Sequence, residues 1–191
     1  SFLINHIKKN QKNWKQVPKI YHGENFQNNI VLSFGEPKTA IFAHIDSIGY
    51  TVSYNNNVVK IGGSKLENDI SLVGEDSQGN IETILKIEKE RAFVKYSRII
   101  DRGTPLSYKV DFKLNNEYVQ SAYLDNRLGV YSALKVAESL TNGVIVFSTW
   151  EEHGGGSVSY LSKFIFEKLG INKALISDIT WITKGIKHNK G

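Results

Sequence analysis

The sequence contains no cysteine and no methionine among its 191 residues. Without cysteine the chain has no disulfides, no thiolate metal ligands and no cysteine nucleophile. Any metal ligands must then be His, Asp or Glu, which suit zinc, cobalt, manganese or magnesium. No apolar run approaches the roughly 20 residues of a membrane helix, and the first residues, SFLINHIKKNQKNWKQ, are too polar for a signal peptide. We therefore expect a cytoplasmic protein without a membrane partner.

Charge of one sign does not dominate the chain. The net charge is +5, 40% of the residues are hydrophobic and 23% are charged, as in ordinary globular proteins. The lysines are scattered except near the N-terminus, and no aromatic-plus-basic pattern typical of RNA binding is present. We expect a basic, solvated surface and no nucleic-acid partner. The length suffices for one sizeable core, or for one domain with a small insertion.

The order of sequence patterns predicts an α/β fold with an all-β insertion. An amphipathic helix over 2–14 precedes two strand-like runs, NNIVLSFG and KTAIFAHID. Residues 50–118 hold short β-rich runs separated by turn residues. Beyond them, NRLGVYSALKVAESL and SVSYLSKFIFEKLG have helical periodicity, and GVIVFSTW and KALISDIT read as strands. We expect a mainly parallel sheet flanked by helices in residues 1–49 and 119–191, and a β-rich insertion domain in 50–118.

Acidic residues and one histidine follow the predicted strands. In open α/β sheets, ligands bind beyond the carboxyl ends of the strands, so these side chains should meet at one edge. Taken singly, each has an ordinary explanation as a helix cap, a turn residue or a solvated loop edge. Together they would repel strongly, and a pair of divalent ions would relieve that repulsion. The residues are His44, Asp46, Asp125, Glu151, Glu152 and Asp178.

Four motifs follow one another along the chain: AHIDSIGY, YLDNRLGV, STWEEHGG and ISDIT. They resemble those of co-catalytic metallo-aminopeptidases of the glutamyl/deblocking (tetrahedral) type, which are also called cellulase-like or endoglucanase-like. The similarity covers the whole chain, with a β insertion in the expected place. It implies a zinc-peptidase-like fold, two divalent metal ions such as zinc or cobalt, peptide substrates with a free N-terminus, and homo-oligomers.

The resemblance also implies the metal ligands. His44 and Asp178 would bind one ion, Asp125 would bridge the two, and Glu152 would bind the second. The family takes a last histidine ligand from a C-terminal segment, and this sequence ends before such a segment. His188, in the turn-like stretch GIKHNKG, does not match that ligand position. We therefore expect a chain that lacks the family's C-terminal part.

Two further residues have implied catalytic roles. Glu151 would be the general base that takes a proton from the metal-activated water and returns it to the leaving amine. Asp46 would orient His44 by accepting a hydrogen bond from its second ring nitrogen. The two residues are two positions apart, so they lie on one face as far as the strand extends. The resemblance therefore predicts removal of N-terminal residues from peptides.

The sequence also departs from the family's pattern. Ser47 stands where the family has Glu, and His153 displaces the glycine that follows the two glutamates. The Ser47 change and the absent C-terminal histidine leave open a non-catalytic relative that keeps the fold. A metal-independent glycosidase with paired carboxylates is a further alternative. A serine hydrolase is excluded because GGGSVS lacks the G-x-S-x-G pattern; Ser157 there is instead expected to cap the next helix.

Overall fold

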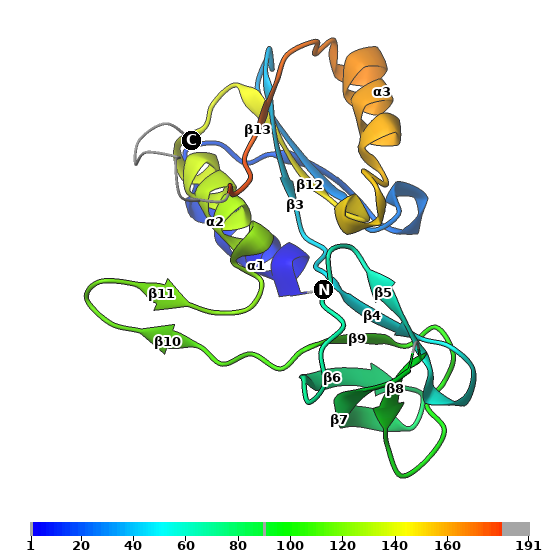
Figure 1. Ribbon diagram of the computed structural model, residues 1–191. Helices are drawn as coiled ribbons and strands as arrows, with labels where there is room; N and C mark the ends of the chain where they lie inside the picture. Colours follow the sequence, from blue (N-terminus) through cyan, green and yellow to red (C-terminus); the bar gives the residue numbers. More distant parts are fainter. Residues whose placement is uncertain (1, 90, 181–191) are drawn as a thin grey trace. The chain divides into compact units, whose positions relative to one another are not determined.

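The computed structural model describes residues 2–89 and 91–180 of the chain (Figure 1). Contacts divide these residues into two compact units. Unit 1 comprises residues 2–46, 124–151 and the described residues from 155 onward, and unit 2 comprises 47–123 and 152–154. The domain boundaries expected at 49/50 and 118/119 stay a prediction. No helix in the described part of the chain is long and apolar enough to cross a membrane.

Unit 1 is built on a five-stranded sheet with the order β1-β2-β12-β3-β13. The pairs β1–β2 and β2–β12 are antiparallel, and the pairs β12–β3 and β3–β13 are parallel. The α/β class is confirmed, but a mainly parallel sheet is not, because the sheet is mixed. The connection 35–39 between β2 and β3 is too short for the crossover that parallel strands require, so these two strands run in opposite directions. The strands are β1 (Lys19–His22), β2 (Ile30–Phe34), β3 (Ala40–His44), β12 (Gly143–Ser148) and β13 (Ala174–Ile176).

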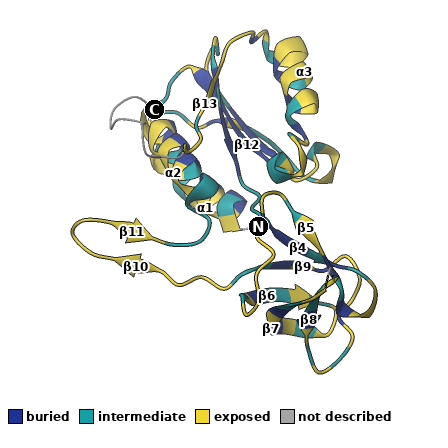
Figure 2. Cartoon of the chain, in the orientation of Figure 1, coloured by how far each residue is buried: buried dark blue, intermediate teal, exposed yellow. Residues whose placement is uncertain are grey.

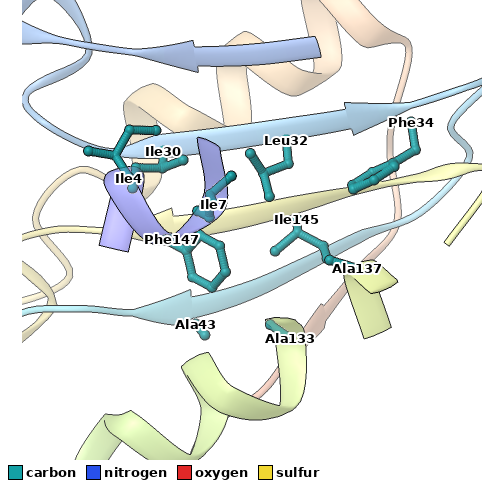
Figure 3. Close-up of a cluster of buried hydrophobic side chains, with 10 residues drawn as sticks. All are labelled: Ile4, Ile7, Ile30, Leu32, Phe34, Ala43, Ala133, Ala137, Ile145 and Phe147. Carbon is teal, nitrogen blue, oxygen red and sulfur yellow. The ribbon is translucent and has the colours of Figure 1, made fainter. Parts of the chain in front are cut away.

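Helices cover both faces of this sheet (Figure 1). α1 (Phe2–Asn10) and α2 (Leu124–Ser139) pack on one face, and α3 (Val158–Leu169) packs on the other. Alternate residues of β12 enter the two layers: Ile145 and Phe147 on the α1–α2 side (Figure 3), Val144 and Val146 on the α3 side. The helix expected over 2–14 ends sooner, since α1 gives way to the short 3-10 helix η1 (Gln11–Asn13).

Unit 2 contains a six-stranded sheet with the order β5-β4-β9-β6-β7-β8, in which every described pairing is antiparallel. Its buried side chains meet in a core around Tyr50, Leu72, Leu85 and Leu106, and Figure 2 shows buried stretches in its strands β4 and β9. A separate two-stranded sheet, β10–β11, is exposed. The elements are β4 (Gly49–Val52), η3 (Tyr54–Asn56), β5 (Val58–Ile61), β6 (Ser71–Asp76), β7 (Gly79–Glu88), β8 (Arg91–Lys95), β9 (Pro105–Tyr108), β10 (Lys113–Leu114) and β11 (Val119–Gln120).

A partly buried ion pair should make the stability of unit 2 depend on pH. The Asp76 carboxylate is fully buried and accepts hydrogen bonds from Arg98 Nη1 at 2.6 Å and Nη2 at 2.8 Å. The Arg98 guanidinium holds the pKa of Asp76 well below its usual range, against the opposing effect of burial. Because the folded-state pKa is depressed, this contribution is present above about pH 4 and is lost as the pH falls through the folded-state pKa.

We therefore expect the free energy of unfolding of unit 2 to fall on acidification below about pH 4. Urea unfolding, followed by the NMR signals of residues in unit 2, measures it. Asp76→Asn should lower the free energy of unfolding at pH 7 and flatten its decline toward pH 3. Asp111→Asn is the matched control, because Asp111 pairs with Lys113 at an exposed site. Equal acid sensitivity in the wild type and Asp76→Asn would contradict the assignment.

Candidate metal centre

The strand register brings the predicted site residues of unit 1 to one level. Parallel pairing sets Ser148 opposite His44, and Ile176 opposite Phe42. Asp178, two residues beyond Ile176, therefore falls level with His44 and on the same face of the sheet. This is the face that α3 covers. The carboxyl ends of β3, β12 and β13 thus form the edge at which the sequence predicts a site.

Three carboxylates surround one nitrogen of His44. The imidazole is buried, with 4% of its surface exposed, and its Nε2 lies 2.9 Å from Asp125 Oδ1. Asp178 Oδ1 lies 3.7 Å and Glu151 Oε2 4.0 Å from the same nitrogen. The structure thus brings together four of the predicted residues, from β3, the start of α2 and the segments after β12 and β13.

Asp46 links the other side of His44 to the Glu151 segment. His44 Nδ1 lies 3.2 Å from the backbone oxygen of Asp46 and 3.7 Å from its carboxylate. The Asp46 carboxylate accepts a hydrogen bond from the backbone N–H of Glu151 at 3.1 Å. Asp46 therefore contacts both the imidazole of His44 and the segment that carries Glu151, and its role in orienting His44 stays a prediction.

The negative charges around His44 together outweigh the effect of burial on the pKa of its imidazole. Burial by itself lowers the pKa of the imidazole. Hydrogen bonds to Asp46 and Asp125 oppose this effect, and the negative charges of Asp178 and Glu151 add to them, so the pKa of His44 rises to about 9. An imidazolium here is the positive partner that the carboxylates hold when no other cation is present.

Glu152 follows Glu151 in the 3-10 helix η4 (Glu151–His153) and groups with unit 2. Its role as a ligand of the second ion stays a prediction. His188 lies outside the described residues. The other predicted ligands, His44, Asp125 and Asp178, each offer one atom within 4.8 Å of the others. One buried imidazole nitrogen with two carboxylate oxygens is a donor set that suits zinc or cobalt, so these residues fit a divalent ion.

Asn126 is a site residue that the sequence prediction missed. Its side chain is buried, donates from Nδ2 to the backbone oxygen of Ser177 at 2.7 Å, and accepts from Gly129 N at 2.9 Å. It thereby connects the start of α2, next to Asp125, to the residue before Asp178. The peptide bond between Asp125 and Asn126 is cis. Gly129 permits this approach, because a Cβ there would lie 2.2 Å from Asn126 Oδ1.

A second missed residue, Asn29, closes the loop that carries Glu151. Asn29 is fully buried, and its Oδ1 accepts from Thr149 N at 2.6 Å and from Ser157 Oγ at 2.8 Å. The single hydroxyl hydrogen of Ser157 is shared between Asn29 Oδ1 and the Thr149 backbone oxygen, which lies 2.7 Å from Oγ. Ser157 precedes α3 as expected, but its side chain makes no capping hydrogen bond. We call this arrangement of Asn29, Thr149 and Ser157 the loop clasp.

The loop inside the clasp depends on one glycine. Trp150 and Gly156 both have positive φ, 68° and 37°. A Cβ on Gly156 would lie 2.2 Å from both Trp150 Cβ and the Trp150 oxygen, so only glycine fits there. Within the GGG run this close packing belongs to Gly156, since a Cβ on Gly154 or Gly155 would meet nothing within 4 Å.

The comparisons with known proteins agree on the fold. No protein-family model and no curated protein matches the chain. Solved structures do match. An aminopeptidase from the archaeon Desulfurococcus kamchatkensis has 19% sequence identity and a TM-score of 0.72, over 99% of this chain and 60% of that one. The TET1 peptidase of Pyrococcus horikoshii, which can assemble into a tetrahedron or a large octahedral shell, has 17% identity and a TM-score of 0.69, over 96% and 67%.

A third match is the TET aminopeptidase from the marine sediment archaeon Thaumarchaeota archaeon SCGC AB-539-E09, with 14% identity and a TM-score of 0.70, over 94% of this chain and 60% of that one. The chain thus spans 60% to 67% of the length of these relatives. The resemblance to tetrahedral aminopeptidases is confirmed at the level of the fold.

Proposed function

We propose that the chain is the metal-binding part of an aminopeptidase that removes N-terminal residues from peptides. The observation that carries the proposal is the convergence of Asp125, Asp178 and Glu151 on Nε2 of the buried His44. The fold shared with solved aminopeptidases supports it. His44 and Asp178 would hold one divalent ion, Asp125 would bridge to a second, and Glu152 would hold that second ion.

Zinc or cobalt ions held there would supply Lewis acidity for the scissile carbonyl and lower the pKa of water. Glu151 would take the proton from the attacking water and return it to the leaving amine. Asp46 would keep the His44 imidazole oriented and Glu151 in place through the backbone hydrogen bond between Glu151 and Asp46. The remaining acidic charge would favour a substrate whose α-amino group is a free ammonium.

Homo-oligomerisation belongs to the same proposal. The Pyrococcus horikoshii relative can assemble into a tetrahedron or a large octahedral shell, and another solved match has a dodecamer in its asymmetric unit. We propose that this chain also functions as a homo-oligomer.

The metal proposal predicts that the chain binds about two cobalt(II) ions, as expected of a carboxylate-bridged pair, and that Asp125→Ala loses both. Metal per chain is measured by elemental analysis after titration and removal of free cobalt. Glu167→Ala is the control, because Glu167 lies exposed on α3 and pairs at 3.8 Å with Lys163. A folded chain that binds no cobalt specifically would contradict the catalytic assignment and favour a non-catalytic relative.

A further inference from the structure

Glu152, the residue proposed to hold the second ion, lies against a turn of unit 2. Residues 152–154 group with this unit, although Glu151 just before them belongs to unit 1. The turn follows β5, and its first residue is Gly62. A Cβ on Gly62 would lie 2.5 Å from Glu152 Oε2 and 3.3 Å from the Glu152 backbone oxygen. The Glu152 carboxylate therefore occupies space that is open only because Gly62 has no side chain.

The turn is fixed to the core of unit 2. Ser64 is fully buried, and its Oγ donates to the Ile61 backbone oxygen at 2.9 Å, which closes the turn around Gly62. Directly after it, the Lys65 backbone oxygen accepts a hydrogen bond from the hydroxyl group of Tyr50, which is itself fully buried in that core. Because the turn is held at both ends, by β5 and by this hydrogen bond, it cannot simply move aside to admit a larger residue.

A side chain at position 62 would have to be accommodated by its neighbours. Its Cβ would also lie 2.8 Å from Ile48 Cγ2, well inside the roughly 3.5–4.0 Å at which carbon atoms pack. The Glu152 carboxylate is the end of a flexible, partly buried side chain, so it can move to another rotamer more easily than the backbone can shift. Gly62 also has a φ of 60°, which glycine adopts readily. A larger residue is therefore expected to displace the carboxylate while the unit stays folded.

We propose that Gly62 is a positioning residue for the second metal ion: having no side chain, it lets the Glu152 carboxylate take the place from which it binds that ion. The proposal rests on the ligand role proposed above for Glu152. The turn that Gly62 begins is anchored in the core of unit 2, so the β-rich unit takes part in the metal chemistry. Changes beside a metal ligand usually cost about 10–100-fold in metal affinity, and a change at Gly62 should act in this way.

The first test measures the affinity of each cobalt(II) ion by calorimetric titration. Gly62→Ala should weaken binding of the second ion by about 10–100-fold and leave the first unchanged. Gly63→Ala and Gly103→Ala are the matched controls, because a Cβ at either position would meet nothing within 4 Å, and Gly103 shares the positive φ, at 85°. Neither control should change either affinity. An unchanged second affinity in Gly62→Ala, or an equal loss in Gly103→Ala, would overturn the proposal.

A double substitution separates positioning from general damage to the site. Glu152→Ala removes the proposed ligand and should itself weaken binding of the second ion. Adding Gly62→Ala should then cause no further loss, because no carboxylate remains to be displaced. A further loss would mean that Gly62→Ala disturbs the site by another route, and the proposal would fail while the proposed function stands. Two tightly bound ions in Glu152→Ala would contradict the ligand role itself and the proposal with it.

A last measurement needs neither metal nor turnover. In the metal-free chain, NMR should show a nuclear Overhauser effect between an α proton of Gly62 and the γ protons of Glu152. Gly62→Ala should shift the carboxyl carbon resonance of Glu152, and Gly103→Ala should leave it in place. Both results in a chain that binds no cobalt would support the placement of Glu152 by Gly62 while the proposed function fails. An unmoved carboxyl resonance in Gly62→Ala would overturn the proposal even if peptides are cleaved.

Discussion

Glu151→Gln should lower the rate of N-terminal residue release by about 10²–10⁴-fold, the usual contribution of a positioned acid–base group. Glutamine keeps the size of the side chain and the backbone N–H that donates to Asp46, but it cannot take a proton from water. The loss should therefore appear in kcat, with KM nearly unchanged.

Two accompanying measurements separate this role from a structural one. Cobalt uptake by Glu151→Gln should match that of the wild type, because Glu151 is proposed as the base and not as a ligand. Glu167→Gln makes the same chemical change at an exposed position of α3 and should leave the rate unaffected. An active Glu151→Gln enzyme would mean that another group accepts the proton.

The second large effect is expected from Asn29→Ala, which opens the loop clasp. The change leaves Thr149 N without its acceptor and removes one of the two acceptors of Ser157 Oγ. A buried polar group left without a partner costs about 1–3 kcal/mol, so the free energy of unfolding should fall by about that amount. Urea unfolding measures the loss, and hydrogen exchange at the Thr149 amide should accelerate.

Asn142→Ala is the matched control for the clasp. Asn142 Oδ1 also accepts a backbone hydrogen bond, from Glu36 N at 2.8 Å, but the side chain is exposed and water can replace it. Its loss should cost less than about 1 kcal/mol. Equal losses for the two variants would show that burial of the Asn29 network adds nothing to stability.

Local patterns in the sequence suffice for much of unit 1. The helical spacing of apolar residues predicts α2 and α3, and the uninterrupted apolar runs predict β3 and β12 because their residues are buried on both faces of the sheet. The rule that ligands gather at the carboxyl ends of strands predicts the meeting of His44, Asp125 and Asp178. The antiparallel directions of β1 and β2 could not be predicted in this way, because they depend on which strands become neighbours in the sheet.

The residues that hold the site were harder to predict than those that form it. Asn29 and Asn126 look like ordinary turn residues, because asparagine is common in turns. What distinguishes them is burial together with hydrogen bonds to segments distant in the sequence, Thr149 for Asn29 and Ser177 for Asn126. Such contacts arise only in the folded chain, and no local pattern marks them.

The pairing of β4 with β9 has a consequence for how the chain folds. β3 and β12 pair in parallel although all of residues 47–123 lie between them, so their meeting closes a very long loop. Within unit 2, Tyr50 pairs with Leu106, near the two ends of that insertion. Once unit 2 has formed, the loop that remains open is far shorter, and its closure costs less conformational entropy. Long-range pairing limits folding rates, so the sheet on which the site is built should assemble faster when unit 2 forms first than when residues 47–123 are still unfolded.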